Sequence, residues 1–153
     1  WFLLNAFWKK VLRICSCFGR KAEKPTDVAT YEMFRWQHIH DQMKAGNCDD
    51  EMKPINKNWG NGRSCKDQNT FIVSSEPKVQ KICKDKGIAD GKFTWSTEMF
   101  KIVNCDWVKT STYPHCEYKG THEDQMYLKV ECRNKEPIHY HVVNGRLATA
   151  LDQ

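Results

Sequence analysis

Two of the six histidines and one lysine stand out as residues that could carry acid–base chemistry. They are His38, Lys66 and His139, far apart in the sequence. An unperturbed imidazole titrates near pH 6.5, so two histidines can divide the work of a general base and a general acid close to neutral pH. A lysine ammonium beside them can stabilise negative charge that develops during the reaction. Together the three residues predict general acid–base catalysis with electrostatic stabilisation.

The sequence around these residues forms three segments. They are the pair Gln37-His38, the run CKDQNTF at 65–71 and the run PIHY at 137–140. In this order they resemble the pancreatic-type ribonuclease (ribonuclease A) superfamily, which has a Gln-His pair on its first helix, a CKxxNTF segment and a Pro-Val-His-Phe strand. The resemblance covers about residues 31–144. It implies an α+β, ribonuclease A-like fold of three short helices and a bent antiparallel sheet, stapled by disulfides.

The resemblance also implies a reaction and a role for each site residue. The implied reaction cleaves single-stranded RNA after pyrimidines through a 2′,3′-cyclic phosphate, with no cofactor and no metal. His38 would take the proton of the ribose 2′-OH, His139 would protonate the leaving 5′-oxygen, and Lys66 would stabilise the phosphorane. The residues implied to bind the substrate are Gln37, Asn69, Thr70 and Tyr140.

Three positions depart from the family pattern. Many active relatives carry an Asp two residues after the acid histidine, where this chain has His141. His141 could still accept a hydrogen bond from His139, but in its protonated form it would repel that residue. We therefore expect the acid limb of the pH–rate profile to lie lower than in relatives with the Asp. Met33 and Arg133 replace residues that flank the phosphate and the second base, so we also expect an altered preference 3′ to the cleavage site.

The two His-x-His pairs raise metal binding as an alternative. On a helix, His38 and His40 would lie about 200° apart and could not easily share an ion. On a strand, His139 and His141 would project from one face, so a zinc site there stays open, although we expect none. Ordinary core or surface roles are assigned to His40, His115 and His122.

The elements that must position these residues follow from the spacing of apolar and turn-forming residues. Helical patterns are found at 31–43, 48–58 and 76–83, and the loop NWGNGRS occupies 58–64. Runs of β-branched and aromatic residues predict strands at 69–74, 100–108, 116–119, 126–133 and 138–143. Early helices followed by a series of strands indicate an α+β domain.

Eight cysteines indicate a disulfide framework and a secreted, extracellular protein. The spacing Cys-x-x-Cys does not occur, and sequence alone leaves 105 complete pairings open. The resemblance implies three bridges: Cys48–Cys105, Cys65–Cys116 and Cys83–Cys132. Cys15 and Cys17 then stand outside the framework and could link chains, carry a lipid or be free.

Residues 1–30 differ from the rest of the chain in charge. They hold six basic and two acidic side chains, a net of +4, whereas residues 31–153 hold 18 basic and 17 acidic ones, a net of +1. Basic residues interrupt the apolar run at 1–18 too early for a transmembrane span, and they follow the apolar run, unlike those of a signal peptide. An amphipathic helix in contact with a membrane surface and a remnant without a role remain as alternatives.

We therefore divide the chain into a cationic N-terminal extension with a linker, 1–30, and a ribonuclease A-like domain, 31–153. Because the domain nets only +1, RNA binding is expected to depend on a local cleft around Lys66 and the two histidines. RNA is the expected partner, with a membrane surface and a cytosolic ribonuclease inhibitor as further candidates. The alternative function is that of a catalytically weak, secreted host-defence or membrane-active protein on the same fold. No pattern indicates an oligomeric state.

Overall fold

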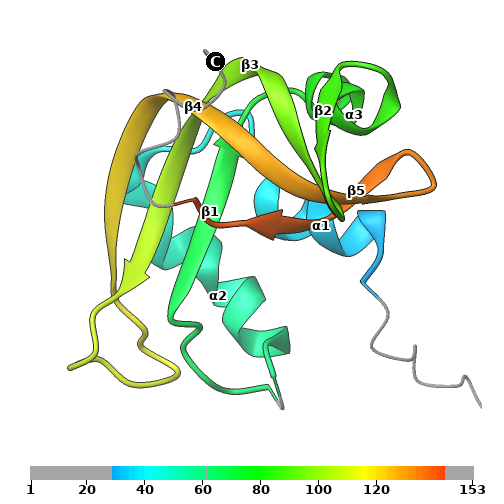
Figure 1. Ribbon diagram of the computed structural model, residues 1–153. Coiled ribbons are helices and arrows are strands. Elements are labelled where there is room, and N and C mark those ends of the chain that lie inside the picture. The colour runs from blue at the N-terminus through cyan, green and yellow to red at the C-terminus, as the bar shows by residue number, and fades with distance from the viewer. Residues whose placement is uncertain (1–28, 61, 144–153) are drawn as a thin grey trace, which may run out of the picture.

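The computed structural model describes residues 29–60 and 62–143 as three α-helices, one 3₁₀-helix and five strands (Figure 1). The helical elements are α1 (Tyr31–His38), the 3₁₀-helix η1 (Ala45–Asn47), α2 (Cys48–Asn58) and α3 (Glu76–Lys84). The strands are β1 (Gln68–Val73), β2 (Gly87–Asp90), β3 (Phe93–Trp107), β4 (Tyr118–Arg133) and β5 (Glu136–His141). The predicted α+β class with three short helices is confirmed.

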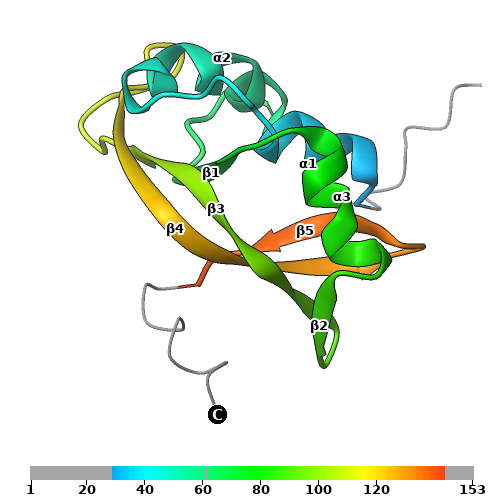
Figure 2. The same ribbon diagram turned by 90° about the horizontal axis from the view of Figure 1, so that it is seen from above.

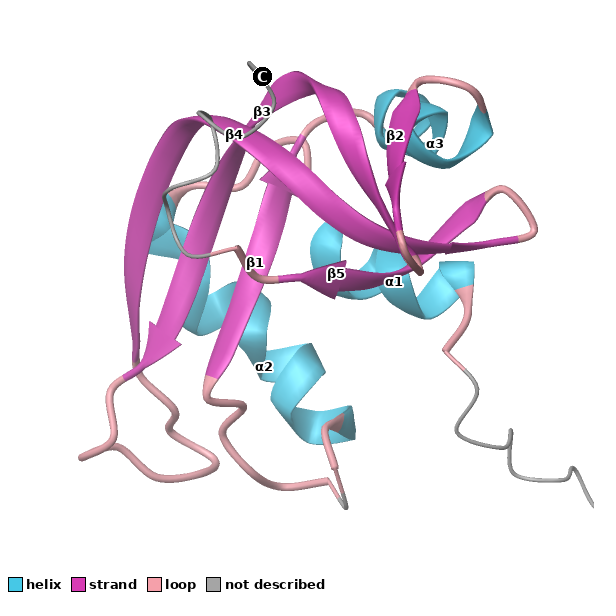
Figure 3. Ribbon diagram, in the orientation of Figure 1, coloured by secondary structure: helices cyan, strands magenta, loops and turns pink. Residues whose placement is uncertain are grey.

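The strands form one antiparallel sheet in the order β1-β3-β4-β5, with β2 also paired to β3. The long β3–β4 ribbon carries two register shifts, and bulges of this kind bend and twist a sheet. Figure 2 shows the bend, with α2 near one end of the ribbon and α3 near the other. α1 contacts both β1 and β5, so residues from three elements that are far apart in the sequence lie near one another (Figure 3).

Several predicted element boundaries differ from the structure. The helix predicted over 31–43 ends at His38, because Ile39 takes an extended conformation and forms a parallel bridge with Ile72. The strands predicted at 116–119 and 126–133 are parts of the single strand β4, and β2 was not predicted. In each case a tertiary pairing outweighs the local pattern.

Two hydrophobic cores lie on either side of β1. The first core joins α1, α3 and the middle of the sheet through Phe34, Ile72, Val79, Ile82, Phe100, Ile102, Leu128 and Val130. The second core joins α2 to the sheet through Met43, Cys48, Met52, Ile55, Phe71, Val103, Cys105 and Tyr118. Adjacent strand residues point to opposite faces, so Phe71 enters the second core and Ile72 the first. Burial on both faces fixes β1 firmly beside the site.

Three disulfides join the described elements: Cys48–Cys105, Cys65–Cys116 and Cys83–Cys132. These are the pairs that the family resemblance implies. They close loops of 49 to 57 residues, and a bridge across such a loop typically stabilises a domain by about 2–4 kcal/mol. None of the helices in the described ranges is long and apolar enough to cross a membrane.

Candidate active site

His38 is the last residue of α1, a helix whose first turn is capped by Thr30. Its Nδ1 lies 2.8 Å from the backbone carbonyl of Thr70, and because a carbonyl can only accept, Nδ1 donates and Nε2 keeps its lone pair. The pKa of His38 is lowered from 6.5 to about 4. Burial is the main cause, the charges of Lys66 and His139 add to it, and the Thr70 hydrogen bond opposes it. His38 is therefore neutral at pH 7 and can accept a proton.

Lys66 follows Cys65 just before β1, and its ammonium is held by two neighbours. Its Nζ donates to Asn69 Oδ1 at 2.9 Å and lies 4.3 Å from the ring centroid of Trp59. Burial lowers the pKa of Lys66 from 10.5 to about 8, which still leaves the ammonium as the main form at pH 7. An ammonium has three protons, so two remain for a bound anion.

Asn69 is buried, and both ends of its side-chain amide are occupied by protein groups. Its Oδ1 accepts from Lys66, and its Nδ2 donates to the backbone carbonyl of Gln37 at 2.8 Å. The resemblance implies a substrate contact for Asn69. That contact stays a prediction, and in the structure the Asn69 amide also ties Lys66 to the last turn of α1.

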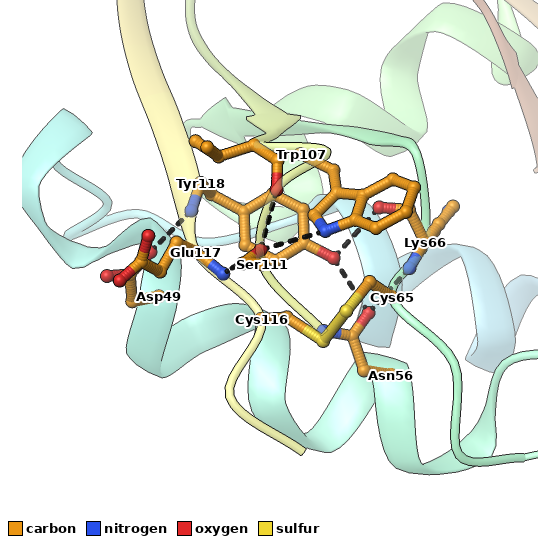
Figure 4. The surroundings of a disulfide bond; sticks show 10 residues. Asp49, Asn56, Cys65, Lys66, Trp107, Ser111, Cys116, Glu117 and Tyr118 are labelled. Carbon is orange, nitrogen blue, oxygen red and sulfur yellow. Dashed lines mark hydrogen bonds between the residues drawn. A yellow bond between two sulfur atoms is a disulfide. The ribbon is translucent and has the colours of Figure 1, made fainter. Parts of the chain in front are cut away.

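The backbone of Lys66 is fixed by its surroundings (Figure 4). The Cys65–Cys116 disulfide anchors the preceding residue, and the Lys66 N–H donates to Asn56 Oδ1 at 2.9 Å. The hydroxyl of Tyr118 lies 2.8 Å from the Lys66 carbonyl and 2.9 Å from Asn56 Oδ1, so its single proton is shared between two acceptors. Asn56 and Tyr118 are both buried, which makes these hydrogen bonds costly to lose.

Thr70 and Tyr140 form the part of the site that could face a base. The Thr70 hydroxyl donates to Asn104 Oδ1 at 2.7 Å, which leaves its oxygen able to accept a further hydrogen bond. The Tyr140 ring lies 5.7 Å from that of His38, centroid to centroid. Burial raises the pKa of Tyr140 to about 12, so its hydroxyl is protonated at neutral pH.

His139 lies in β5 and is partnered by a carboxylate from the neighbouring strand. Its Nδ1 is 3.0 Å from Glu131 Oε2, whereas the ring of His141 lies 4.7 Å from that of Phe93. The residue that accepts from His139 Nδ1 is therefore Glu131, and not His141, which the sequence left as a possible acceptor. The physical reason is proximity: directly paired residues on adjacent strands are closer than residues two apart on one strand.

One cavity of about 420 Å³ brings the predicted residues together. All seven of them line it: Gln37, His38, Lys66, Asn69, Thr70, His139 and Tyr140. Met33 also lines it and is 49% exposed. Among the described residues, no group of three or more His, Cys, Asp or Glu side chains could hold a metal ion.

Three residues around the cavity were missed by sequence reasoning: Trp59, Asn104 and Glu131. Asn104 pairs with Thr70 across β1 and β3. Its position next to Cys105, a cysteine of the expected framework, could have placed it near the site. Trp59 ends α2 at the start of a glycine-rich loop, and an aromatic side chain there could have been assigned to the cavity wall. Glu131 carried no usable signal, because a bulge determines its partner.

The arrangement supplies what cleavage of a phosphodiester requires. A neutral imidazole with a free Nε2, a second imidazole oriented by a carboxylate, and an ammonium with two free protons line the same cavity. The first can remove a proton, the second can deliver one, and the third can stabilise added negative charge on the phosphoryl group.

Comparisons with known proteins point to one family. Residues 29–143 match the family described as pancreatic ribonuclease. Angiogenin-1 of Bos taurus is 33% identical over 116 residues, covering 74% of this chain and 77% of that protein. Ribonuclease-like 3 of Danio rerio is 25% identical over 134 residues, covering 85% and 89%. The X-ray structure of zebrafish RNase5 superposes with a TM-score of 0.67 at 30% identity, covering 72% of this chain and 91% of that one.

Proposed function

The chain belongs to the pancreatic ribonuclease family, and from this premise we propose that it is a secreted endoribonuclease that cleaves single-stranded RNA 3′ of pyrimidines without a metal ion. A ribonuclease-type function follows from the family and from relatives named as ribonucleases. In the proposed step the ribose 2′-oxygen bonds to phosphorus and the bond from phosphorus to the 5′-oxygen breaks. The products are a 2′,3′-cyclic phosphate and a 5′-hydroxyl.

Each proton in this step has an assigned carrier. His38 Nε2 takes the proton of the 2′-OH, and protonated His139 gives one to the departing 5′-oxygen. Lys66 stabilises the charge on the phosphorane, and Gln37 hydrogen-bonds a phosphoryl oxygen. The observation that carries the proposal is the state of His38: its tautomer is set by Thr70, and its lowered pKa keeps it neutral at physiological pH.

The preference for pyrimidines is supported by the Thr70–Asn104 pair. The Thr70 hydroxyl lines the cavity, and its bond to Asn104 fixes where its acceptor positions point. We expect Thr70 to pair with the base edge and Tyr140 to pack near the ring. The three disulfides support secretion, because such bridges persist in oxidising compartments.

Turnover of a pyrimidine dinucleotide such as uridylyl-adenosine tests the proposal. We expect His38→Ala and His139→Ala each to lower kcat/KM by about 10²- to 10⁴-fold, the usual contribution of a general acid or base. His115→Ala is the matched control, since His115 is exposed and does not line the cavity. Wild-type cleavage no faster than that of His38→Ala would refute the enzyme assignment.

The charge distribution supports a second candidate function. The net charge of +4 on residues 1–30 favours a membrane-active role for the extension, with the domain as its carrier. Residues 1–18, with Cys15 and Cys17, lie outside the described residues, so this stays a prediction, as does the boundary at residue 30. Leakage of anionic vesicles that survives His38→Ala and vanishes on deletion of 1–20 would favour it.

A further inference from the structure

Glu131 contacts His139, the proposed general acid, but has no role of its own in the proposed reaction. It lies in β4 directly opposite His139 of β5, with its Oε2 3.0 Å from His139 Nδ1. The side chain of Glu131 is 24% exposed and that of His139 59% exposed, so the carboxylate is the more enclosed member of the pair. Because a carboxylate only accepts, Nδ1 must carry a proton.

A β-bulge brings this pair together. Next to the turn at 134–135, Arg133 pairs with Glu136 and Cys132 pairs with Pro137. If this register continued without a break, Ile138 would lie opposite Glu131. The register shift between Glu131 and Cys132 makes Ile138 the extra residue, and its side chain is buried at 6% exposure. His139 is thereby moved opposite the carboxylate. Bulges commonly re-aim a side chain in this way next to active sites.

We propose that Glu131 is the positioning residue of the general acid, orienting the His139 ring so that Nε2–H points to the leaving 5′-oxygen. The inference rests on the proposed function of the site. In the family pattern an Asp on the same strand as the acid histidine has this place; here His141 occupies that position and its ring lies against Phe93. The acceptor for His139 Nδ1 is instead Glu131 of the neighbouring strand β4.

The hydrogen bond from His139 is also the main cause of a lowered pKa at Glu131, so the carboxylate is ionised at neutral pH. Its other close partner is Lys92, whose Nζ lies 4.0 Å from Oε2. The Lys92 side chain is 69% exposed, and an ion pair of that length at the surface is weak. Lys92→Ala removes this ion pair and leaves the pair with His139 in place, which makes it the matched control.

The test compares two substrates that differ in how much the leaving group needs a proton. Uridylyl-adenosine releases an alkoxide, which must be protonated. Uridine 3′-(4-nitrophenyl phosphate) releases nitrophenolate, a stable anion that departs without an acid. A residue that acts only through the general acid affects the first substrate and spares the second. A misfolded variant loses activity on both, so the second substrate also reports folding.

We expect Glu131→Ala to lower kcat on uridylyl-adenosine by about tenfold with little change in KM, and to stay within about twofold of wild type on the nitrophenyl substrate. Glu131→Gln, whose amide oxygen can still accept, should recover most of the loss, and Lys92→Ala should leave both substrates unchanged. Equal loss on both substrates, no loss on either, or a glutamine variant no better than alanine would overturn the inference. A wild-type protein that turns over neither substrate would instead refute the proposed function, and this inference with it.

Discussion

The hydroxyl of Tyr118 helps to hold the backbone of Lys66, and it can be removed without removing the ring. Tyr118→Phe removes one oxygen and keeps the ring, which packs in the second core. The Lys66 carbonyl loses its donor at 2.8 Å, and Asn56 Oδ1 loses one of the two donors it has. Because Asn56 and the Tyr118 ring are buried and Lys66 is half-buried, water does not readily replace the lost hydrogen bond.

The magnitude follows from that burial. Leaving a buried acceptor unsatisfied costs about 1–3 kcal/mol. In a domain of this size each kcal/mol lowers the melting temperature by roughly 3–6 °C, so Tm should fall by about 3–18 °C. The Lys66 backbone also gains freedom, and we expect kcat/KM on uridylyl-adenosine to fall about three- to tenfold, which corresponds to roughly 0.7–1.4 kcal/mol. Burial raises the pKa of Tyr118, so the hydroxyl stays protonated and the difference in Tm should be constant from pH 5 to pH 8.

Thermal unfolding followed by circular dichroism and steady-state kinetics on the dinucleotide measure the two effects. Tyr127→Phe is the matched control: Tyr127 lies on the same strand, is half-buried and makes no hydrogen bond through its hydroxyl to any described residue. Melting temperatures of the two variants within about 1 °C of each other would show that the Tyr118 hydroxyl does not fix Lys66, and the reasoning would fail.

Three further predictions concern the cavity itself. Trp59→Ala should lower kcat/KM about two- to tenfold, measured on the dinucleotide, because Lys66 loses a cation–π contact; an unchanged rate would contradict that role. Asn104→Asp should lower cytidine turnover relative to uridine turnover. The Asn104 amide can accept from the Thr70 hydroxyl or, turned over, donate to it, whereas a carboxylate can only accept. The Thr70 hydroxyl of the variant must then accept from the base, which uracil N3–H allows and cytosine N3 does not. The acid limb of the pH profile of kcat/KM should have its midpoint well below 6.5, since the base must be neutral and burial lowers the pKa of His38 to about 4; a midpoint at or above 6.5 would contradict this.

Site residues that lie in short, recognisable sequence motifs were predictable from the sequence. His38, Lys66 and His139 each lie in a short run whose order along the chain resembles one family, and all three line the same cavity. The second helix was predicted at 48–58 and is found at Cys48–Asn58, because its apolar spacing and the first-turn acids agree with its packing.

Features that depend on pairing between distant segments were not predictable. The first helix ends at His38 rather than at residue 43 because Ile39 pairs with Ile72, which no local pattern reveals. Glu131 was missed because its partner is set by a bulge, and a shift of one residue changes which side chains meet. Burial of His38, the proposed base, gives a separate reason to expect a low acid limb, and the effect of His141 on His139 stays a prediction.

The chemical nature of the RNA ends tests the central claim most directly. A single-stranded oligonucleotide with one uridine, incubated with the protein in excess EDTA, is analysed by mass spectrometry. The proposed reaction predicts a 2′,3′-cyclic phosphate on the 5′ fragment and a 5′-hydroxyl on the 3′ fragment, both absent with His38→Ala. A 3′-hydroxyl paired with a 5′-phosphate, cleavage abolished by EDTA, or the same products from His38→Ala would contradict it.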